Sequence, residues 1–145
     1  MSLPFAFWDT SALIPLCTWQ MQTAQARRLY AGFGVVVWWA TPVEIISGLT
    51  RLERMGEIDH DEFLAGKQQA QALSMIWNSI RPPTSIAAQA CSLLELYPLR
   101  SADALQLSAA MEYFGHATSQ GNVFITADQR LADAARRIGF LVEFI

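Results

Sequence analysis

The stretch Phe5-Ala6-Phe7-Trp8-Asp9 places a carboxylate directly after four apolar residues. The pattern returns near the other end of the chain, where Val123-Phe124-Ile125-Thr126 leads through Ala127 to Asp128. Short apolar runs of this length are typical of buried β-strands. In an open α/β sheet the strand ends and helix starts lie along one edge, where ligands bind. We therefore expect Asp9 and Asp128 at the same edge of a sheet.

Two further acids stand where a helix is expected to begin. Glu44 lies in Thr41-Pro42-Val43-Glu44 after an apolar run, and Asp103 lies in Arg100-Ser101-Ala102-Asp103. Carboxylate oxygens are ligands that magnesium prefers in proteins. Four carboxylates gathered at one sheet edge would form a magnesium site, and magnesium sites of this kind cut phosphodiesters.

Each of these acids also has a structural explanation. Glu44 is the third residue after Thr41, so the pair predicts a capping box at a helix start. Asp103 would lie in a first turn, where the helix dipole favours an anion, whereas Asp9 and Asp128 could be N-caps. Both interpretations stay open for each residue taken alone. The occurrence of an acid at four separate helix starts favours a shared purpose.

The arrangement of apolar runs predicts the fold class. At 145 residues the chain has the length of one domain, residues 1–145, and its strand-like and helical patterns alternate around an all-helical middle, which indicates the α/β class. Trp38 and Trp39 should point to opposite faces if their strand continues through both. The expected strands are 5–8, 35–39, 123–126 and 140–145; the expected helices are 12–30 with a possible break at Pro15, one starting at Thr41, 59–80, 84–97, 101–114 and 128–138, and a turn-rich loop covers 115–122.

Composition limits the cellular setting. The N-terminus lacks a signal peptide, and no apolar stretch approaches the roughly 18 residues of a membrane span, which predicts a cytoplasmic protein without membrane contact. Cys17 and Cys91 lack disulfide or zinc spacing and are expected to be buried free thiols. The formal net charge of -3 is unfavourable for binding nucleic acid. However, nine of the ten basic residues are Arg, which suits bidentate phosphate contacts.

Four segments, in order along the whole chain, resemble a known family. They are Trp8–Leu13 (WDTSAL), Thr41–Leu49 (TPVEIISGL), Leu99–Ala110 (LRSADALQLSAA) and Phe124–Leu131 (FITADQRL). Together they closely resemble the signature segments of the PIN domain (PilT N-terminus), in particular of VapC-type toxins in type II toxin–antitoxin pairs. The resemblance implies a three-layer α/β/α sandwich with a central, mostly parallel sheet and a helical middle segment. It also implies a metal-dependent endoribonuclease.

The resemblance assigns roles to individual residues. It implies a catalytic, metal-binding quartet supported by three hydroxyl residues: Asp9, Glu44, Asp103 and Asp128, with Thr10, Ser11 and Thr126. Hard carboxylate oxygens with no His or Cys cluster select Mg²⁺, or Mn²⁺ as a substitute, over zinc. Arg100, one helical turn before Asp103, and Arg130 are candidate substrate-binding residues. The family further implies an RNA substrate cut to 5′-phosphate and 3′-hydroxyl ends, a cognate antitoxin and a homodimer.

Some features depart from this interpretation or compete with it. Pro15-Leu16 stand where many relatives have a basic residue that would contact RNA. Haloacid-dehalogenase phosphatases and phosphoacceptor receiver domains each need a late Lys, but the sole lysine, Lys67, lies in a polar helical stretch. Two alternatives stay open. One is a non-catalytic α/β binding module whose acids cap helices, and the other is a PIN-fold nuclease that acts in RNA processing rather than as a toxin.

Overall fold

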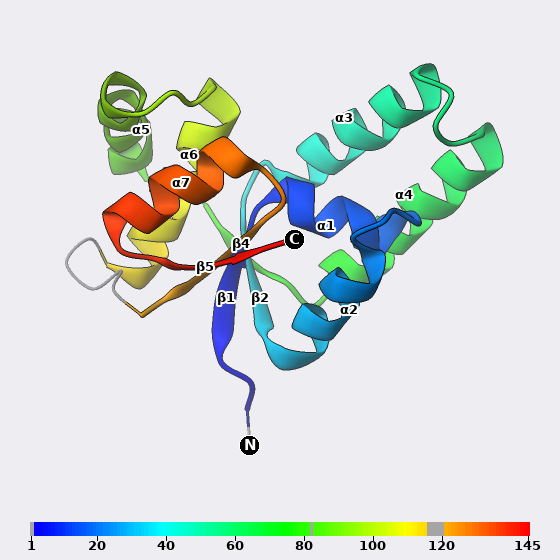
Figure 1. Ribbon diagram of the computed structural model, residues 1–145, viewed down its shortest axis with the longest axis horizontal. Coiled ribbons are helices and arrows are strands. Elements are labelled where there is room, and N and C mark those ends of the chain that lie inside the picture. The colour runs from blue at the N-terminus through cyan, green and yellow to red at the C-terminus, as the bar shows by residue number, and fades with distance from the viewer. Residues whose placement is uncertain (1, 82, 116–120) are drawn as a thin grey trace.

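The structure is a computed structural model that describes residues 2–81, 83–115 and 121–145 (Figure 1). Its centre is a five-stranded sheet in the order β3-β2-β1-β4-β5, and every neighbouring pair of strands is parallel. Buried Phe7 of the central strand β1 lies in register between Val36 of β2 and Phe124 of β4. The strands are β1 Phe5–Trp8, β2 Gly34–Trp38, β3 Asn78–Ile80, β4 Val123–Thr126 and β5 Leu141–Phe144.

Helices cover both faces of this sheet, as Figure 1 shows. One face packs against α1 Thr10–Cys17, α2 Thr23–Gly32, α3 Thr41–Arg54 and α4 His60–Ser74, and the other against α5 Thr84–Leu96, α6 Ser101–Phe114 and α7 Gln129–Ile138. Alternate strand residues feed two separate cores, with Trp8 on the α1 side and Phe7 on the α6 side. The predicted three-layer α/β/α sandwich is therefore confirmed.

The order of the strands creates a crevice at one edge. The chain runs from β1 outward through β2 to β3, then returns to the other side of β1 to form β4 and β5. Helix α1 therefore leaves β1 towards one face, while α7 leaves the neighbouring strand β4 towards the other. Ligands in open α/β sheets bind at such a switch point, outside the carboxyl ends of the strands.

The middle of the chain differs from the predicted single helix over 59–80. Helix α4 ends at Ser74, and Asn78–Ile80 forms the edge strand β3 beside Val36–Trp38. A three-residue strand is too short to show an alternating pattern, and Trp77 and Ile80 continue the helical stripe, so only the tertiary pairing reveals it. Pro15, where a break was expected, lies inside α1, and Pro82 lies outside the described residues.

Helical sequence over 12–30 forms two helices rather than one. The break lies after Cys17, not at Pro15, and it is stabilised by Thr23, whose hydroxyl accepts a hydrogen bond from Gln20 N and donates one to the Pro15 carbonyl. Proline removes a backbone donor but is tolerated within this short helix. The remaining elements fall within about two residues of the expected bounds.

Several smaller expectations can also be checked. Trp38 is buried and Trp39 is 56% exposed, but β2 ends at Trp38, so the strand does not continue through both residues as the prediction required. Cys17 is a buried free thiol, whereas Cys91 is exposed, so that part of the prediction is wrong. Within the described ranges, no helix has the length and apolar character needed to cross a membrane. Most of the predicted 115–122 loop lies outside the described residues.

Candidate metal centre at the sheet edge

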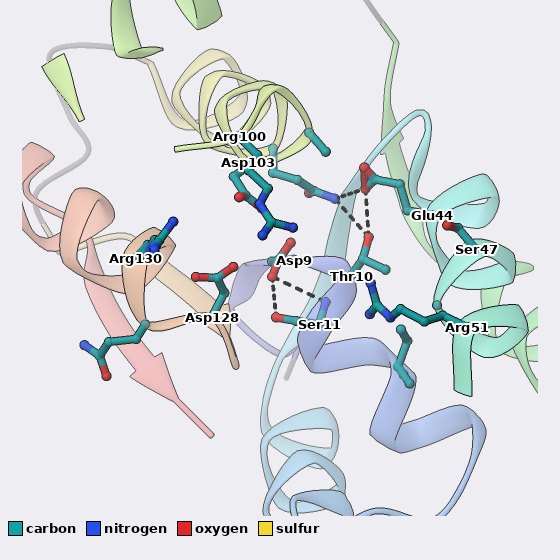
Figure 2. A pocket seen from close by; sticks show the side chains of 15 residues that line it. Asp9, Thr10, Ser11, Glu44, Ser47, Arg51, Arg100, Asp103, Asp128 and Arg130 are labelled. Carbon is teal, nitrogen blue, oxygen red and sulfur yellow. Dashed lines mark hydrogen bonds between the residues drawn. The ribbon is translucent and has the colours of Figure 1, made fainter. Parts of the chain in front are cut away.

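A pocket of about 610 Å³ opens at the carboxyl ends of the central strands (Figure 2). We call it the acidic pocket, because all four acids predicted from the sequence line it. The fold therefore brings four carboxylates that are widely separated in the sequence to the lining of one pocket. Its lining is Asp9, Thr10, Ser11, Ile14, Glu44, Ser47, Gly48, Arg51, Arg100, Ala102, Asp103, Gln106, Asp128, Gln129 and Arg130.

Asp9 is held at the floor of the pocket by donors to one of its oxygens. Its Oδ2 accepts hydrogen bonds from the Ser11 backbone N (3.3 Å), from the Ser11 hydroxyl and from the Thr126 hydroxyl (2.9 Å). The pairing of β1 with β4 explains this arrangement, since Trp8 is in register with Ile125 and the next residues, Asp9 and Thr126, meet beyond it. Asp9 also serves as the N-cap of α1.

The environment of Asp9 changes its protonation. The side chain is 4% exposed, and this burial raises the pKa of the carboxyl from 3.8 to about 6. Hydrogen bonds from Ser11 and Thr126 oppose the rise, and repulsion from Asp103 and Glu44 adds to it. A buried carboxylate facing two other carboxylates gains stability if a cation neutralises it.

Asp128 is connected to Asp9 through hydroxyl groups. Thr126 Oγ1 accepts a hydrogen bond from the Asp128 backbone N (3.0 Å) while it donates to Asp9. Ser11 Oγ accepts one from the Ala127 backbone N (2.9 Å). The Asp128 carboxylate caps α7, because its Oδ1 accepts a hydrogen bond from Leu131 N at 3.2 Å. The predicted supporting roles of Ser11 and Thr126 thus have a clear geometric basis.

Glu44 does not form the capping box that the sequence suggested. The N-cap of α3 is Ala40 rather than Thr41, and the buried Thr41 hydroxyl has no hydrogen-bond partner in the described part of the chain. Glu44 Oε1 instead accepts hydrogen bonds from the Thr10 hydroxyl (2.9 Å) and from Gln106 Nε2. These donors hold the carboxylate at the pocket, where Figure 2 shows it opposite Asp103 and Asp128.

Asp103 lies in the first turn of α6, one turn before Gln106. Burial raises the pKa of its carboxyl first, and repulsion from Asp128 and Glu44 raises it further. A hydrogen bond from the Arg100 backbone and the charge of that arginine act in the opposite direction. Electrostatic repulsion therefore couples all four acids. The pKa of Asp103 is raised by Asp128 and Glu44, and the pKa of Asp9 is raised by Asp103 and Glu44.

Three arginines stand around the acids, and two of them were predicted. Figure 2 places Arg100 beside Asp103, Arg130 on the Asp128 side and Arg51 on the Thr10 and Glu44 side. Sequence reasoning missed Arg51 and Gln106. Arg51 lies seven residues after Glu44, which is two turns along the same face of α3, and that spacing is the signal that could have found it. Gln106 lies three residues after Asp103, but its apolar neighbours made it resemble core.

The donor chemistry of the pocket fits a hard divalent cation. All four acids supply carboxylate oxygens, which suit Mg²⁺ or Mn²⁺, and neither His nor Cys lines the pocket. As they stand, no three Asp, Glu, His or Cys side chains among the described residues are grouped closely enough to hold a metal ion. The chemistry of the donors therefore fits such a cation, although the four carboxylates are not gathered into a coordination shell.

Comparisons with known proteins agree with this fold. The PIN domain model matches residues 6–137. No curated protein matches the chain. One similar solved structure is a toxin–antitoxin complex from Klebsiella pneumoniae, with 19% identity, a TM-score of 0.63, and coverage of 88% of this chain and 90% of that one. Another is VapC20 from Mycobacterium tuberculosis, a Sarcin-Ricin loop cleaving toxin, with 21% identity, a TM-score of 0.63, and coverage of 89% and 94%. Because the family model spans most of its length, the chain belongs to the PIN domain family.

Proposed function

We propose that the chain is a Mg²⁺- or Mn²⁺-dependent endoribonuclease and the toxin of a type II toxin–antitoxin pair. The observation that carries this proposal is the acidic pocket, in which four carboxylates from separate segments converge and three arginines surround them. Membership of the PIN domain family supports a nuclease. The two similar solved structures, a toxin–antitoxin complex and a toxin that cleaves the Sarcin-Ricin loop, support the toxin role.

Each side chain has a defined task in this proposal. Asp9 and Asp103 are the central metal ligands, and Glu44 and Asp128 bind directly or through water. When bound, a divalent cation supplies an activated water at neutral pH and neutralises charge on the leaving oxygen. Ser11 and Thr126 orient Asp9, as their hydrogen bonds indicate, and Thr10 orients Glu44.

The arginines bind the substrate in this proposal. Arg51, Arg100 and Arg130 are all exposed at the pocket, so their guanidinium groups can reach phosphates on either side of the scissile bond. A guanidinium matches a phosphate with two parallel hydrogen bonds. The three arginines place positive charge at the pocket, where the RNA would lie, in a chain whose formal net charge is -3. A bound divalent cation would neutralise part of the charge of the four carboxylates beside them.

The alternative of a non-catalytic module whose acids only cap helices explains part of the site. Asp9, Asp103 and Asp128 each accept a hydrogen bond at a helix start. Glu44, in contrast, accepts its hydrogen bonds from side chains of two other helices. Capping also gives no reason for four acids to face one pocket and repel one another, whereas a cation site does.

The toxin role carries further expectations. We infer a cytoplasmic protein that forms a homodimer and is inhibited by a cognate antitoxin, as the family resemblance implies. A small open reading frame directly upstream of the gene would support the antitoxin. Sequencing RNA ends after brief expression separates a toxin from an RNA-processing nuclease. New ends in an essential RNA together with growth arrest indicate a toxin, whereas maturation of one precursor without arrest indicates processing.

Purified protein without antitoxin provides the direct test of the activity. We expect cleavage of RNA with Mg²⁺ or Mn²⁺ and none in EDTA. Asp9→Ala and Asp103→Ala should each abolish cleavage and keep the circular dichroism spectrum of the wild type. The matched control is Asp61→Ala, which removes an exposed acid from the first turn of α4, outside the pocket, and should keep full activity. Full activity in EDTA, or in both pocket variants, would refute the metal mechanism.

A further inference from the structure

Gln106 is a buried polar side chain at the back of the acidic pocket. It is 1% exposed and lies on α6 among buried apolar residues such as Ala104 and Leu107. A buried amide is costly unless hydrogen bonds satisfy it. Its Nε2 donates to Thr10 Oγ1 at 3.0 Å and to Glu44 Oε1. Both amide protons are therefore donated to side chains that line the acidic pocket.

Chemistry determines the direction of each hydrogen bond in this group. An ionised carboxylate is only an acceptor, so Glu44 Oε1 must face donors. The single proton of the Thr10 hydroxyl therefore goes to Glu44, and the Thr10 oxygen accepts from Gln106. The opposite amide orientation would place the Gln106 carbonyl against the carboxylate, which would be repulsive. Thr10, Glu44 and Gln106 thus form a closed group with one consistent arrangement.

The orientation of Gln106 leaves its other polar atom without compensation. Gln106 Oε1 is buried and has no hydrogen-bond partner among the residues that the structure describes. An unsatisfied buried carbonyl is unfavourable for folding. An apolar side chain of similar size would avoid this cost, so the stability of the core gives no reason for an amide at this position.

The three members of the group come from three helices. Thr10 lies on α1 and Glu44 on α3, which cover one face of the sheet, while Gln106 lies on α6 on the other face. Asp103 lies on the same helix, one turn before Gln106. The hydrogen bond from Gln106 to Glu44 therefore connects the helix that carries Asp103 with the Glu44 carboxylate.

We propose that Gln106 is a positioning residue that, together with Thr10, occupies Glu44 Oε1 and thereby leaves a single oxygen of Glu44, Oε2, to act in the acidic pocket. This inference rests on the proposed function, because it assigns a task to a metal-binding Glu44. The same principle operates at Asp9, where Ser11 and Thr126 occupy Oδ2. Hydrogen-bonded partners of ligands orient them and tune metal affinity.

The test is a double-mutant cycle that measures Mn²⁺ binding by calorimetry alongside RNA cleavage. Gln106→Met keeps the length of the side chain and removes both donors. We expect it to fold and to lose about 10- to 100-fold in Mn²⁺ affinity and in cleavage, the usual effect of removing such a partner. In a Glu44→Ala background the same substitution should cause no further loss of Mn²⁺ affinity, because Gln106 acts through Glu44.

Two comparisons separate positioning from a general effect on the fold. Ser108→Ala removes a buried hydrogen bond of the same helix, made to the Ile86 carbonyl on the side away from the pocket, and should leave Mn²⁺ affinity unchanged. Gln106→Asn keeps an amide but shortens its reach by one methylene, so it should lower Mn²⁺ affinity as Gln106→Met does. The Asn variant also keeps the experiment decisive if the Met variant does not fold.

The possible results distinguish this inference from the proposed function. Wild-type protein that neither binds Mn²⁺ nor cleaves RNA would overturn the proposed function and this inference with it. An active wild type with unchanged Mn²⁺ affinity in the folded Gln106 variants would overturn only the role of Gln106. Equal losses with and without Glu44 would show that Gln106 acts through the fold rather than through Glu44, and would also overturn it.

Discussion

The acidic pocket has two halves that are held in different ways. In one half, which we call the Asp9 corner (Asp9, Ser11, Thr126 and Asp128), donors come from adjacent parallel strands and from the first turns that follow them. In the other, the Glu44 corner (Thr10, Glu44 and Gln106), donors to Glu44 of α3 come from two other helices, α1 and α6, on opposite faces of the sheet. The first geometry depends on sheet register, and the second depends on how helices pack.

This difference has consequences for how firmly each carboxylate is held. Strand register changes only in whole steps, so the position of Thr126 beside Asp9 is fixed once β1 pairs with β4. The Glu44 corner needs α3 and α6 to stand at the correct separation, which many side chains influence together. Of the two carboxylates, Asp9 is the more deeply buried, because Asp9 is buried and Glu44 is half-buried.

The largest expected effect comes from the burial of Asp9. Burial raises the pKa of its carboxyl from the ordinary value of 3.8 to about 6 in the folded chain, so the folded state keeps a proton that the unfolded state releases. This contribution to stability is fully present below pH 3.8 and is lost as pH rises through about 6. In EDTA, the free energy of unfolding of the wild type should fall relative to Asp9→Asn by about 3 kcal/mol across that window.

Urea unfolding at a series of pH values measures this difference. Asp61→Asn, which neutralises an exposed carboxylate outside the pocket, is the control and should follow the wild type. If Asp9→Asn and the wild type change in parallel with pH, Asp9 is not protonated in the folded chain. The contrast in burial between the two corners would then have no electrostatic consequence.

The next effect tests whether the two corners act as one cation site. The Asp103 carboxylate is repelled by a carboxylate of each corner, Asp128 of the Asp9 corner and Glu44 of the other. Magnesium at about 100 times its dissociation constant should stabilise the wild type by roughly 2.7 kcal/mol, which raises the melting temperature by about 5 to 10 °C. Asp103→Asn should leave the metal-free protein as stable or more stable, because it removes repulsion, and should lose most of the magnesium response.

Thermal melting with and without magnesium measures both quantities. A helix cap would behave differently, since Asp103→Asn would then lower stability modestly and neither protein would respond to magnesium. A wild type that millimolar magnesium does not stabilise, with a variant that is simply less stable, would favour caps over a metal site. Sodium chloride at matched ionic strength controls for general salt effects.

The two corners also differ in how far sequence alone predicts them. The Asp9 corner was predictable, because Asp9 and Ser11 closely follow a strand-like run and Thr126 stands two residues before Asp128. The position of Glu44 was predictable as well, but its capping box was not formed. Partners of Glu44 depend on helix packing, and a lone polar residue such as Gln106 in a buried helix carries no local signal of its partner.

Helices and strands with clear local signals were predicted, whereas the strand that depends on tertiary pairing was not. Alternating strands and helices with clear start and stop residues predicted α6 and β4 with their observed bounds, and Gly139 closes α7 with a positive φ as expected. Strand β3 was not predicted, because its conformation is imposed by pairing with β2 and not by its own three residues. All four acids line the predicted pocket, while their roles in catalysis stay predictions.

The smallest expected effect is on RNA affinity and comes from Arg51, the arginine beside the Glu44 corner. Arg51 lies on the Glu44 side of the pocket and Arg130 on the Asp128 side, so each should contact one phosphate of a bound single strand (Figure 2). Each neutralised phosphate contributes about 0.7 to the slope of log affinity against log salt. In an Asp9→Ala background, which should bind RNA without cutting it, Arg51→Gln should therefore reduce that slope by about 0.7 and weaken binding about fourfold at 0.15 M salt.

Arg54→Gln is the matched control, since Arg54 lies three residues further along α3, is exposed, and does not line the pocket. Fluorescence anisotropy with a labelled oligonucleotide across a salt series gives both numbers. Equal slopes for Arg51→Gln and Arg54→Gln would exclude Arg51 as a substrate contact and leave Arg100 and Arg130 as the candidate RNA contacts.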